Sequence, residues 1–259
     1  RLVCDDGNFI KFVKCDLSQD EDIRKMLNQI GNELVVVDGI INCAAEFPFS
    51  TLQDINIELW DRIHQVNLRA PLQIIKHFLP KLGDNGSIVN FLTIEGGLPF
   101  ASAYCSSKGA SRALLLSLAS EMPEGKYVFG FSPGVVGTNL AETVFSKFAE
   151  ISGITLDQFV ESSVDNPGYE KMMPAEHCAL ALICALEDGK ANHGTVVEPF
   201  IYLEKKSLIK IETKESNKDS GAINKYLDEL KTMGQFIENK IYERLSLIHI
   251  SEPTRLGMI

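Results

Sequence analysis

Residues 86–92, Gly-Ser-Ile-Val-Asn-Phe-Leu, form a short apolar run of strand length, and a long helical pattern follows from about Ser102 to Met122. The same alternation continues on both sides of this pair. Further strand patterns are found at 9–15, 34–41, 127–131 and 195–197, and further helical patterns at about 21–30, 57–78 and 175–186. Strands that alternate with helices of this length predict an α/β fold with a parallel sheet covered by helices on both faces.

Two of the predicted helices carry local signals. Ser18, followed three residues later by Glu21, predicts a capping box at the start of the helix over 21–30. Pro71 lies inside the helical pattern over 57–78, where a residue without a backbone N–H predicts a kink.

The chain has 259 residues, of which 45% are hydrophobic and 23% charged, as is typical of a globular protein. We expect residues 1–203 to form the main domain and residues 204–221 to form a polar linker. Residues 222–244 have apolar side chains at helical spacing and predict an amphipathic helix that docks on this domain. Residues 245–259 resemble the translation of a sequencing adapter, and we exclude them as a suspected artefact.

The charge and the cysteine content limit which ligands, partners and cellular compartment the sequence favours. The net charge of −10 disfavours binding to nucleic acid or to an anionic membrane, and no apolar run has the length of a spanning helix. None of the six cysteines forms a Cys-x-x-Cys pair, and no cysteine or histidine cluster has the spacing of a metal site. We therefore expect no metal, unpaired thiols and a reducing, cytoplasmic compartment.

Tyr104 and Lys108 are four residues apart and lie on the same face of the predicted helix. A free phenol has a pKa near ~10, and a nearby ammonium group favours its ionised form. This pairing makes Tyr104 a candidate general acid and base. Taken alone, the pair is also what an ordinary solvated helix surface contains.

Other polar and small residues follow the ends of predicted strands, where an open α/β sheet binds its ligands. Asp16, Asn42, Thr93 and the pair Pro133-Gly134 occupy such positions. The hydroxyl group of Thr93 can bind a carbonyl oxygen, and Asn67 lies in the preceding helix. These residues together predict a ligand site at the carboxyl edge of the sheet.

In this order and spacing, the segments resemble the short-chain dehydrogenase/reductase family, in its compact single-domain branch. The resemblance covers about residues 8–198. It is carried by residues 15–17 (Cys-Asp-Leu), 41–45 (Ile-Asn-Cys-Ala-Ala), 66–68 (Val-Asn-Leu), 86–90 (Gly-Ser-Ile-Val-Asn), 104–108 (Tyr-Cys-Ser-Ser-Lys) and 133–138 (Pro-Gly-Val-Val-Gly-Thr). It implies a Rossmann-like, doubly wound sheet and an NAD(P)-dependent oxidoreductase that interconverts a carbonyl and an alcohol.

The resemblance implies four catalytic positions. Tyr104 would exchange the proton with the substrate oxygen, and Lys108 would hold the nicotinamide ribose. Thr93, where the family usually has Ser, would orient the substrate carbonyl or alcohol, and Asn67 would help to hold a water that relays protons.

It also implies a binding groove for NAD or NADP, with the choice between them undetermined. Asp16 and Leu17 would meet the adenine, and the backbone of Asn42, Cys43 and Ala44 would line the groove. Val136 and Thr138 would approach the nicotinamide carboxamide and the pyrophosphate, after the turn formed by Pro133 and Gly134.

The chain departs from the family pattern at two levels. Ala45 replaces a Gly, and Thr93 replaces a Ser. No glycine-rich turn joins a first strand to a first helix, so the first βαβ portion would precede Arg1. We therefore expect the 259 residues alone neither to unfold cooperatively nor to bind a dinucleotide tightly.

Three functions are compatible with this pattern. The first is the oxidoreductase, acting on a small-molecule carbonyl or alcohol that is apolar or mixed, because aromatic residues are frequent in the expected lid over 139–175. The second is a non-catalytic dinucleotide-binding or scaffold relative that recruits a partner through residues 222–244. The third is an isomerase or dehydratase that uses the cofactor transiently. The resemblance also implies a homo-oligomer formed through the helices near 57–78 and 102–122.

Overall fold

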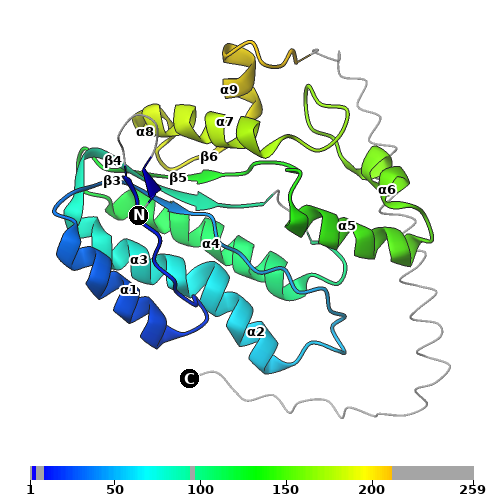
Figure 1. Ribbon diagram of the computed structural model, residues 1–259, viewed down its shortest axis with the longest axis horizontal. Coiled ribbons are helices and arrows are strands. Elements are labelled where there is room, and N and C mark those ends of the chain that lie inside the picture. Colours follow the sequence, from blue (N-terminus) through cyan, green and yellow to red (C-terminus); the bar gives the residue numbers. More distant parts are fainter. Residues whose placement is uncertain (1, 4–8, 94–96, 212–259) are drawn as a thin grey trace, which may run out of the picture. The chain divides into compact units, whose positions relative to one another are not determined.

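The computed structural model describes residues 2–3, 9–93 and 97–211 (Figure 1). Its centre is a parallel sheet with the strand order β3-β4-β5-β6. The four strands are β3 (Val37–Asn42), β4 (Leu82–Phe91), β5 (Tyr127–Phe131) and β6 (Val196–Val197). The strands predicted over 34–41, 86–92, 127–131 and 195–197 are thus confirmed, with small differences at their ends.

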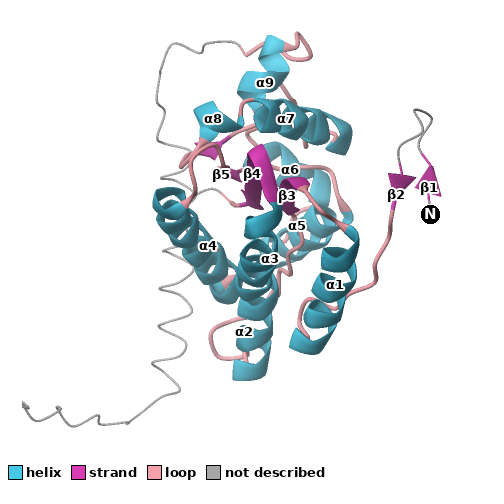
Figure 2. Ribbon diagram, turned by 90° about the vertical axis from the view of Figure 1, so that its left-hand side faces the viewer, coloured by secondary structure: helices cyan, strands magenta, loops and turns pink. Residues whose placement is uncertain are grey.

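Helices cover both faces of this sheet (Figures 1 and 2). One face is covered by α1 (Asp20–Glu33), α2 (Ile57–His64), η1 (Gln65–Arg69), α3 (Ala70–Phe78) and α4 (Ser102–Glu121), and a short 3-10 turn, η2 (Leu79–Lys81), follows α3. The other face is covered by α7 (Ala175–Glu187), α8 (Gly189–Asn192) and α9 (Phe200–Lys205). The lid region contains α5 (Asn139–Ser152) and α6 (Leu156–Ser163). The predicted α/β fold is confirmed.

The apolar character of the central strands follows from this double cover. Ile88 of β4 packs with Val128 of β5 in a cluster under α1, α3 and α4. The next residue, Val89, faces the opposite way and packs with Phe129 against α7 and α9. All four side chains are fully buried. A strand buried on both faces needs apolar residues at successive positions, which is the pattern that predicts it.

The beginning of the chain differs from the prediction of a strand over 9–15. Only β2 (Phe9–Ile10) is extended, and it pairs antiparallel with β1 (Leu2–Val3) outside the parallel sheet. Lys11 then forms an ion pair with Glu33 at the end of α1, so the chain turns toward that helix. As a result β3 forms the edge of the parallel sheet, and Val35 beside it is 86% exposed.

The capping box predicted at Ser18 is wrong. The Ser18 hydroxyl donates to Asp16 Oδ1 (2.7 Å), and the Ser18 backbone N–H donates to the same oxygen (2.9 Å). Asp16 therefore competes successfully for the group that would cap the helix. The N-cap is Gln19, and no side chain caps α1.

The long helical segment over 57–78 is interrupted before Pro71, by the π-helical segment η1. Ala70 N–H donates five residues back, to Gln65 O. Pro71 has no N–H to offer the carbonyl of Asn67, four residues earlier. The Ser111 hydroxyl of α4 donates to that carbonyl instead (3.1 Å). The irregularity expected at Pro71 is therefore also the place where α4 attaches.

The described residues belong to the first of two units, 1–212 and 213–259. Within the interval expected as a linker, α9 extends to Lys205, and Ile209 and Ile211 pack against the cluster of α7 and α9. The helix expected over 222–244 and the suspected artefact over 245–259 lie outside the described residues. In the part that is described, no helix is long and apolar enough to cross a membrane.

Gly130 in the middle of β5 supplies a test of the core packing. A Cβ added there would lie 2.5 Å from Leu92 Cδ1. We expect Gly130→Ala to lower the free energy of unfolding by about 1–3 kcal/mol, because buried neighbours must move. Gly109 of α4 is exposed and has open space around an added Cβ. Gly109→Ala is the matched control and should stabilise by about 0.5–1 kcal/mol. Hydrogen exchange of the amides of β5 and α4 measures both effects without requiring a cooperative transition; equal protection in the two variants would contradict this packing.

Candidate active site

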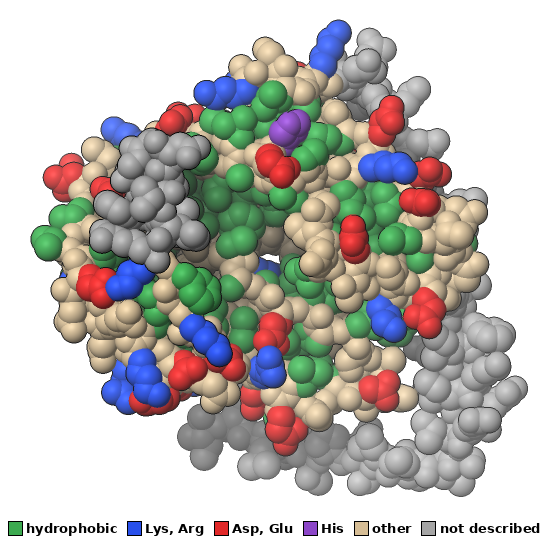
Figure 3. Space-filling model, viewed as in Figure 1, with side chains coloured by type: hydrophobic (Ala, Val, Ile, Leu, Met, Phe, Trp, Pro, Cys, Tyr) green, Lys and Arg blue, Asp and Glu red, His purple; other side chains and the backbone are tan. Residues whose placement is uncertain are grey.

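The candidate site lies at the carboxyl edge of the parallel sheet. The paired residues Asn42 and Asn90, and Phe91 and Phe131, mark the ends of β3, β4 and β5 at this edge. Figure 3 shows a hollow in the surface beside these strand ends and the start of α5, with hydrophobic side chains around it. The loops that follow the strands carry most of the residues singled out in the sequence.

Tyr104 and Thr93 are brought together. Tyr104 is in the first turn of α4, and Thr93 follows the end of β4. The Thr93 side chain lies close to the Tyr104 phenol. Burial raises the pKa of the Tyr104 phenol, and the nearby Thr93 side chain opposes this effect in part. The phenol is therefore protonated at neutral pH and available as a proton donor.

Lys108 is 5% exposed, one helical turn beyond Tyr104. Its Nζ donates to Phe91 O at the end of β4 (2.7 Å) and lies 5.8 Å from the centre of the Tyr104 ring. Burial lowers the pKa of Lys108 to about 8. The expected lowering of the Tyr104 pKa by this ammonium is not found, because burial of the phenol dominates and Lys108 lies over the ring with its charge directed to Phe91.

Asn67 holds the loop that follows β3. Its Oδ1 accepts from Glu46 N–H (2.8 Å), and its Nδ2 donates to Glu46 O (3.0 Å) and to Ser107 Oγ (3.0 Å). Asn67 is 3% exposed. One buried amide therefore fixes the backbone of residue 46 on both sides and connects it with α4 between Tyr104 and Lys108.

Asn166 plays the same part for the loop that follows β5, and the sequence analysis did not identify it. Its Oδ1 accepts from Val135 N–H (3.1 Å), and its Nδ2 donates to Val135 O (2.7 Å). The neighbouring Gly134 has a φ of +71°, and a Cβ there would lie 2.7 Å from Asn166 Oδ1. Asn166 precedes Pro167-Gly168, which is typical of a turn, so no local signal indicates this distant contact.

The remaining groove residues have varied roles. Asn42 Nδ2 donates to Asn90 Oδ1 (2.8 Å) and connects β3 with β4. Cys43 and Ala44 are exposed beyond the strand, and Cys43 lies close enough to Lys108 for the ammonium to lower its thiol pKa against a larger increase from burial. Five cysteines are described and all are free: Cys15, Cys43, Cys105, Cys178 and Cys184.

The loop after β5 leads into α5. Val136 forms a β-bridge with Met173, and Thr138 Oγ1 caps the helix by accepting from Ala141 N–H (3.3 Å). Pro133 and Gly134 form the turn before them, both partly buried.

Known proteins resemble the chain at both the sequence and the structure level. The family model for short chain dehydrogenases matches residues 3–148. The chain belongs to the short-chain dehydrogenase family. D-beta-hydroxybutyrate dehydrogenase from Rhizobium meliloti (strain 1021) is 30% identical over 189 residues, which cover 70% of this chain and 73% of that protein. L-2,3-butanediol dehydrogenase from Corynebacterium glutamicum is 26% identical over 193 residues, which cover 72% and 75%.

A crystal structure of a short chain dehydrogenase family protein from Francisella tularensis subsp. tularensis SCHU S4 superposes with a TM-score of 0.65. It has 27% sequence identity and covers 73% of this chain and 78% of that chain. These matches confirm the family and the Rossmann-like fold that were predicted from the sequence. They also confirm NAD or NADP as the class of cofactor.

The described residues fit one end of such a dinucleotide. Asn90 Nδ2 is buried at the strand ends without a partner among the described residues. This feature, with Lys108 and the start of α5, suits the nicotinamide and its ribose. Among the described strand-to-helix turns, none has the glycine-rich pattern that cradles a pyrophosphate.

Asp16 and Leu17 lie in a separate turn before α1. Asp16 is exposed, and its hydrogen bonds with Ser18 lower the pKa of its carboxyl group. Leu17 packs against the apolar cluster beneath α1 and α3. The Leu17 side chain is therefore directed into the core, and of these two side chains only that of Asp16 is directed to solvent.

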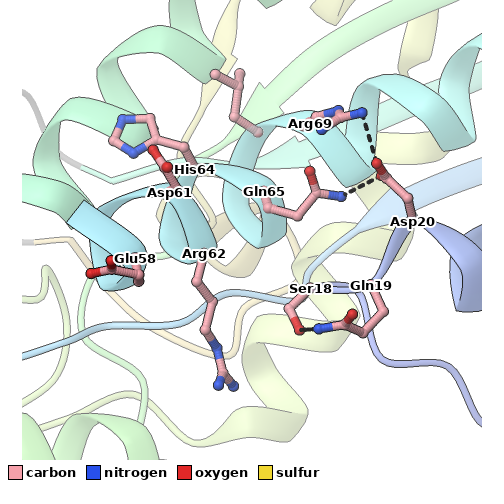
Figure 4. A pocket seen from close by; sticks show the side chains of 10 residues that line it. Ser18, Gln19, Asp20, Glu58, Asp61, Arg62, His64, Gln65 and Arg69 are labelled. Carbon is pink, nitrogen blue, oxygen red and sulfur yellow. Dashed lines mark hydrogen bonds and ion pairs between the residues drawn. The ribbon is translucent and has the colours of Figure 1, made fainter. Parts of the chain in front are cut away.

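A polar pocket adjoins this turn (Figure 4). It is lined from the start of α1 and from α2 and η1 by Ser18, Gln19, Asp20, Glu58, Asp61, Arg62, His64, Gln65, Leu68 and Arg69. Both of its arginines are already paired. Asp20 accepts from Arg69 (2.8 Å) and from Gln65 (3.0 Å), and Arg62 pairs with Glu46 (2.7 Å). The pocket contains none of the predicted catalytic residues.

The buried ammonium of Lys108 predicts a pH dependence of stability. Its pKa is about 8 in the folded state against 10.5 for an unperturbed lysine, so the unfolded chain binds more protons between these values. Lys108 therefore destabilises the fold below pH 8, and this cost disappears as the pH rises through the window. We expect the stability of the wild type relative to Lys108→Met to increase by up to about 3 kcal/mol between pH 7 and 10. The measurement is the hydrogen-exchange protection of the α4 amides, corrected for the intrinsic exchange rate at each pH. A difference between the two proteins that stays constant with pH would contradict the burial of the charge.

The two asparagine contacts predict independent local effects. Asn166→Ala should speed hydrogen exchange of the Val135 amide about tenfold, because its buried N–H loses its acceptor. Asn67→Ala should do the same for the Glu46 amide. Each variant is the control for the other, and exchange that changes at both sites in either variant would show general loosening instead.

Proposed function

We propose that this dehydrogenase interconverts a small-molecule carbonyl and an alcohol, with Tyr104 as the acid and base. The observation that supports this proposal most directly is the position of the Tyr104 phenol at the carboxyl edge of the sheet, close to the Thr93 side chain and with the Lys108 ammonium 5.8 Å from its ring centre. A substrate oxygen placed at these two hydroxyl groups would have one partner to donate a proton and one to orient it.

The proposed proton transfer starts from the protonated form of Tyr104. Burial keeps the phenol protonated at neutral pH, which suits proton donation to a carbonyl oxygen during reduction. Thr93 orients that oxygen and stabilises the phenolate that remains. When bound, NAD or NADP supplies or accepts the hydride.

Lys108 and Asn67 would support this step. An ammonium group has three donors, and Phe91 O takes one of them, which leaves donors for the hydroxyl groups of the nicotinamide ribose. Asn67 fixes the loop after β3 and the neighbouring Ser107, and the water that relays protons would lie next to it.

The other proposed cofactor contacts lie on three segments. They are Asp16 and Leu17 for the adenine, the backbone of Asn42, Cys43 and Ala44 for the groove, and Pro133, Gly134, Val136 and Thr138 for the nicotinamide end. We also propose association of copies of the chain through α2–α3 and α4, whose surfaces expose Leu72 and Leu116.

Replacement of Tyr104 tests the proposed function. The full chain is assayed with NADH and with NADPH on a panel of aldehydes and ketones. Tyr104→Phe should lower kcat/KM at least about 100-fold, because the proton donor is removed and the ring is kept. Tyr127 begins β5, and its phenol donates to Asn85 Oδ1 of β4 (3.4 Å). Tyr127→Phe removes this phenol and should retain activity. Because we expect the chain to bind a dinucleotide weakly, the cofactor is supplied at saturating concentration. Absence of turnover by the wild type under this condition, or full activity of Tyr104→Phe, would refute the proposal.

A further inference from the structure

The ring of Phe47 lies directly beside the ring of Tyr104. Their centres are 4.5 Å apart, and the ring planes are tilted by 41°. Both side chains are partly exposed, so the pair forms part of the wall of the site. Phe47 comes from the loop after β3, whereas Tyr104 comes from α4.

The Phe47 ring is fixed by its neighbours in the chain. On one side, Asn67 binds both backbone groups of Glu46. The Glu46 carboxylate also accepts two hydrogen bonds from the Arg62 guanidinium, from Nε (3.0 Å) to Oε2 and from NH2 (2.7 Å) to Oε1. The backbone that carries Phe47 is therefore held to α2 and η1 at the residue before it.

On the other side, Phe49 anchors the loop in an aromatic cluster. Its ring stacks on Phe100 (5.0 Å, 24°) and meets Phe148 edge-on (5.1 Å, 77°). Phe148 stacks in turn on Phe159 (5.7 Å, 4°), and both are buried. Phe47 packs against this cluster. Phe47 is thus packed between two partners: the aromatic cluster on one side and the Tyr104 ring on the other.

From this arrangement we infer that Phe47 selects substrates with a flat apolar group, aryl or conjugated, next to the reacting carbonyl. The inference uses one part of the proposed function, namely that the substrate oxygen binds at the Tyr104 hydroxyl group. A group attached to that carbonyl then lies beside the Tyr104–Phe47 pair. Aromatic groups gain offset-stacked or edge contacts there beyond the burial of equal area, and a puckered saturated ring cannot form them.

Phe47 is therefore a specificity-determining residue. The proton transfer stays with Tyr104 and Thr93, and the contribution of Phe47 is to the choice between substrates of similar size. Phe145 offers a matched comparison, because its ring belongs to the same region but contacts Phe159 and not Tyr104.

Binding to the full chain tests this inference without turnover. Titrations followed by NMR compare 1-phenylethanol with 1-cyclohexylethanol, which have the same heavy atoms but differ in planarity. We expect the wild type to bind the phenyl compound about fivefold more tightly, the scale of one aromatic contact. Phe47→Leu should reduce the ratio to about 1, whereas Phe47→Trp and Phe145→Leu should keep the preference.

Turnover of acetophenone and cyclohexyl methyl ketone separates this inference from the proposed function. If neither ketone is reduced but the Phe47-dependent binding preference is found, the proposed function fails and the inference stands. Equal binding of the two alcohols, no binding of either, or a preference that survives in Phe47→Leu would overturn the inference. If Phe47→Leu fails to fold, loss of the preference in Phe47→Trp overturns it, and its retention supports it.

Discussion

Pro71 has no backbone N–H, and the arrangement of the site depends on this missing donor. The carbonyl of Asn67 therefore cannot accept from residue 71, four positions later, and it accepts from the Ser111 hydroxyl of α4. The helix widens into η1 at this point. These two adjustments place the Asn67 side chain against Glu46 and Ser107. A residue that ordinarily disrupts a helix thus connects three parts of the site: the loop after β3, the long helical segment and α4.

Two buried asparagines share one task at the carboxyl edge of the sheet. Asn67 binds the backbone N–H and C=O of Glu46, and Asn166 binds those of Val135. Each side-chain amide accepts from a backbone N–H and donates to a backbone C=O, as a neighbouring strand would, for a loop that lies beyond the end of the sheet. Because buried backbone groups need partners, a single amide that satisfies two of them fixes its loop firmly. The loops after β3 and β5 therefore keep hydrogen-bonded backbones where regular secondary structure has ended.

The sequence is a good guide where the interactions are local or periodic. The apolar runs that become β3, β4 and β5 are recognisable because burial on both faces leaves little choice of residue, and the spacing of Tyr104 and Lys108 follows from one helical turn. Distant contacts are not accessible in this way. Nothing near Asn166 or Phe47 indicates their partners. The capping box predicted at Ser18 is wrong because Asp16 competes for the Ser18 hydroxyl group. The strand predicted over 9–15 is longer than the observed β2 because strand pairing depends on distant residues. The expectation that the chain unfolds without cooperativity stays a prediction.

The way in which Asn67 holds its loop also bears on how such an enzyme changes over evolutionary time. The amide recognises the main-chain N–H and C=O of residue 46, which every amino acid except proline provides. Side chains farther along the loop, Phe47 among them, can therefore be exchanged by mutation while the loop keeps its path. If Phe47 sets ligand preference and Tyr104 performs the proton transfer, as proposed, a mutation can alter the first property while the backbone that carries the loop stays fixed by Asn67.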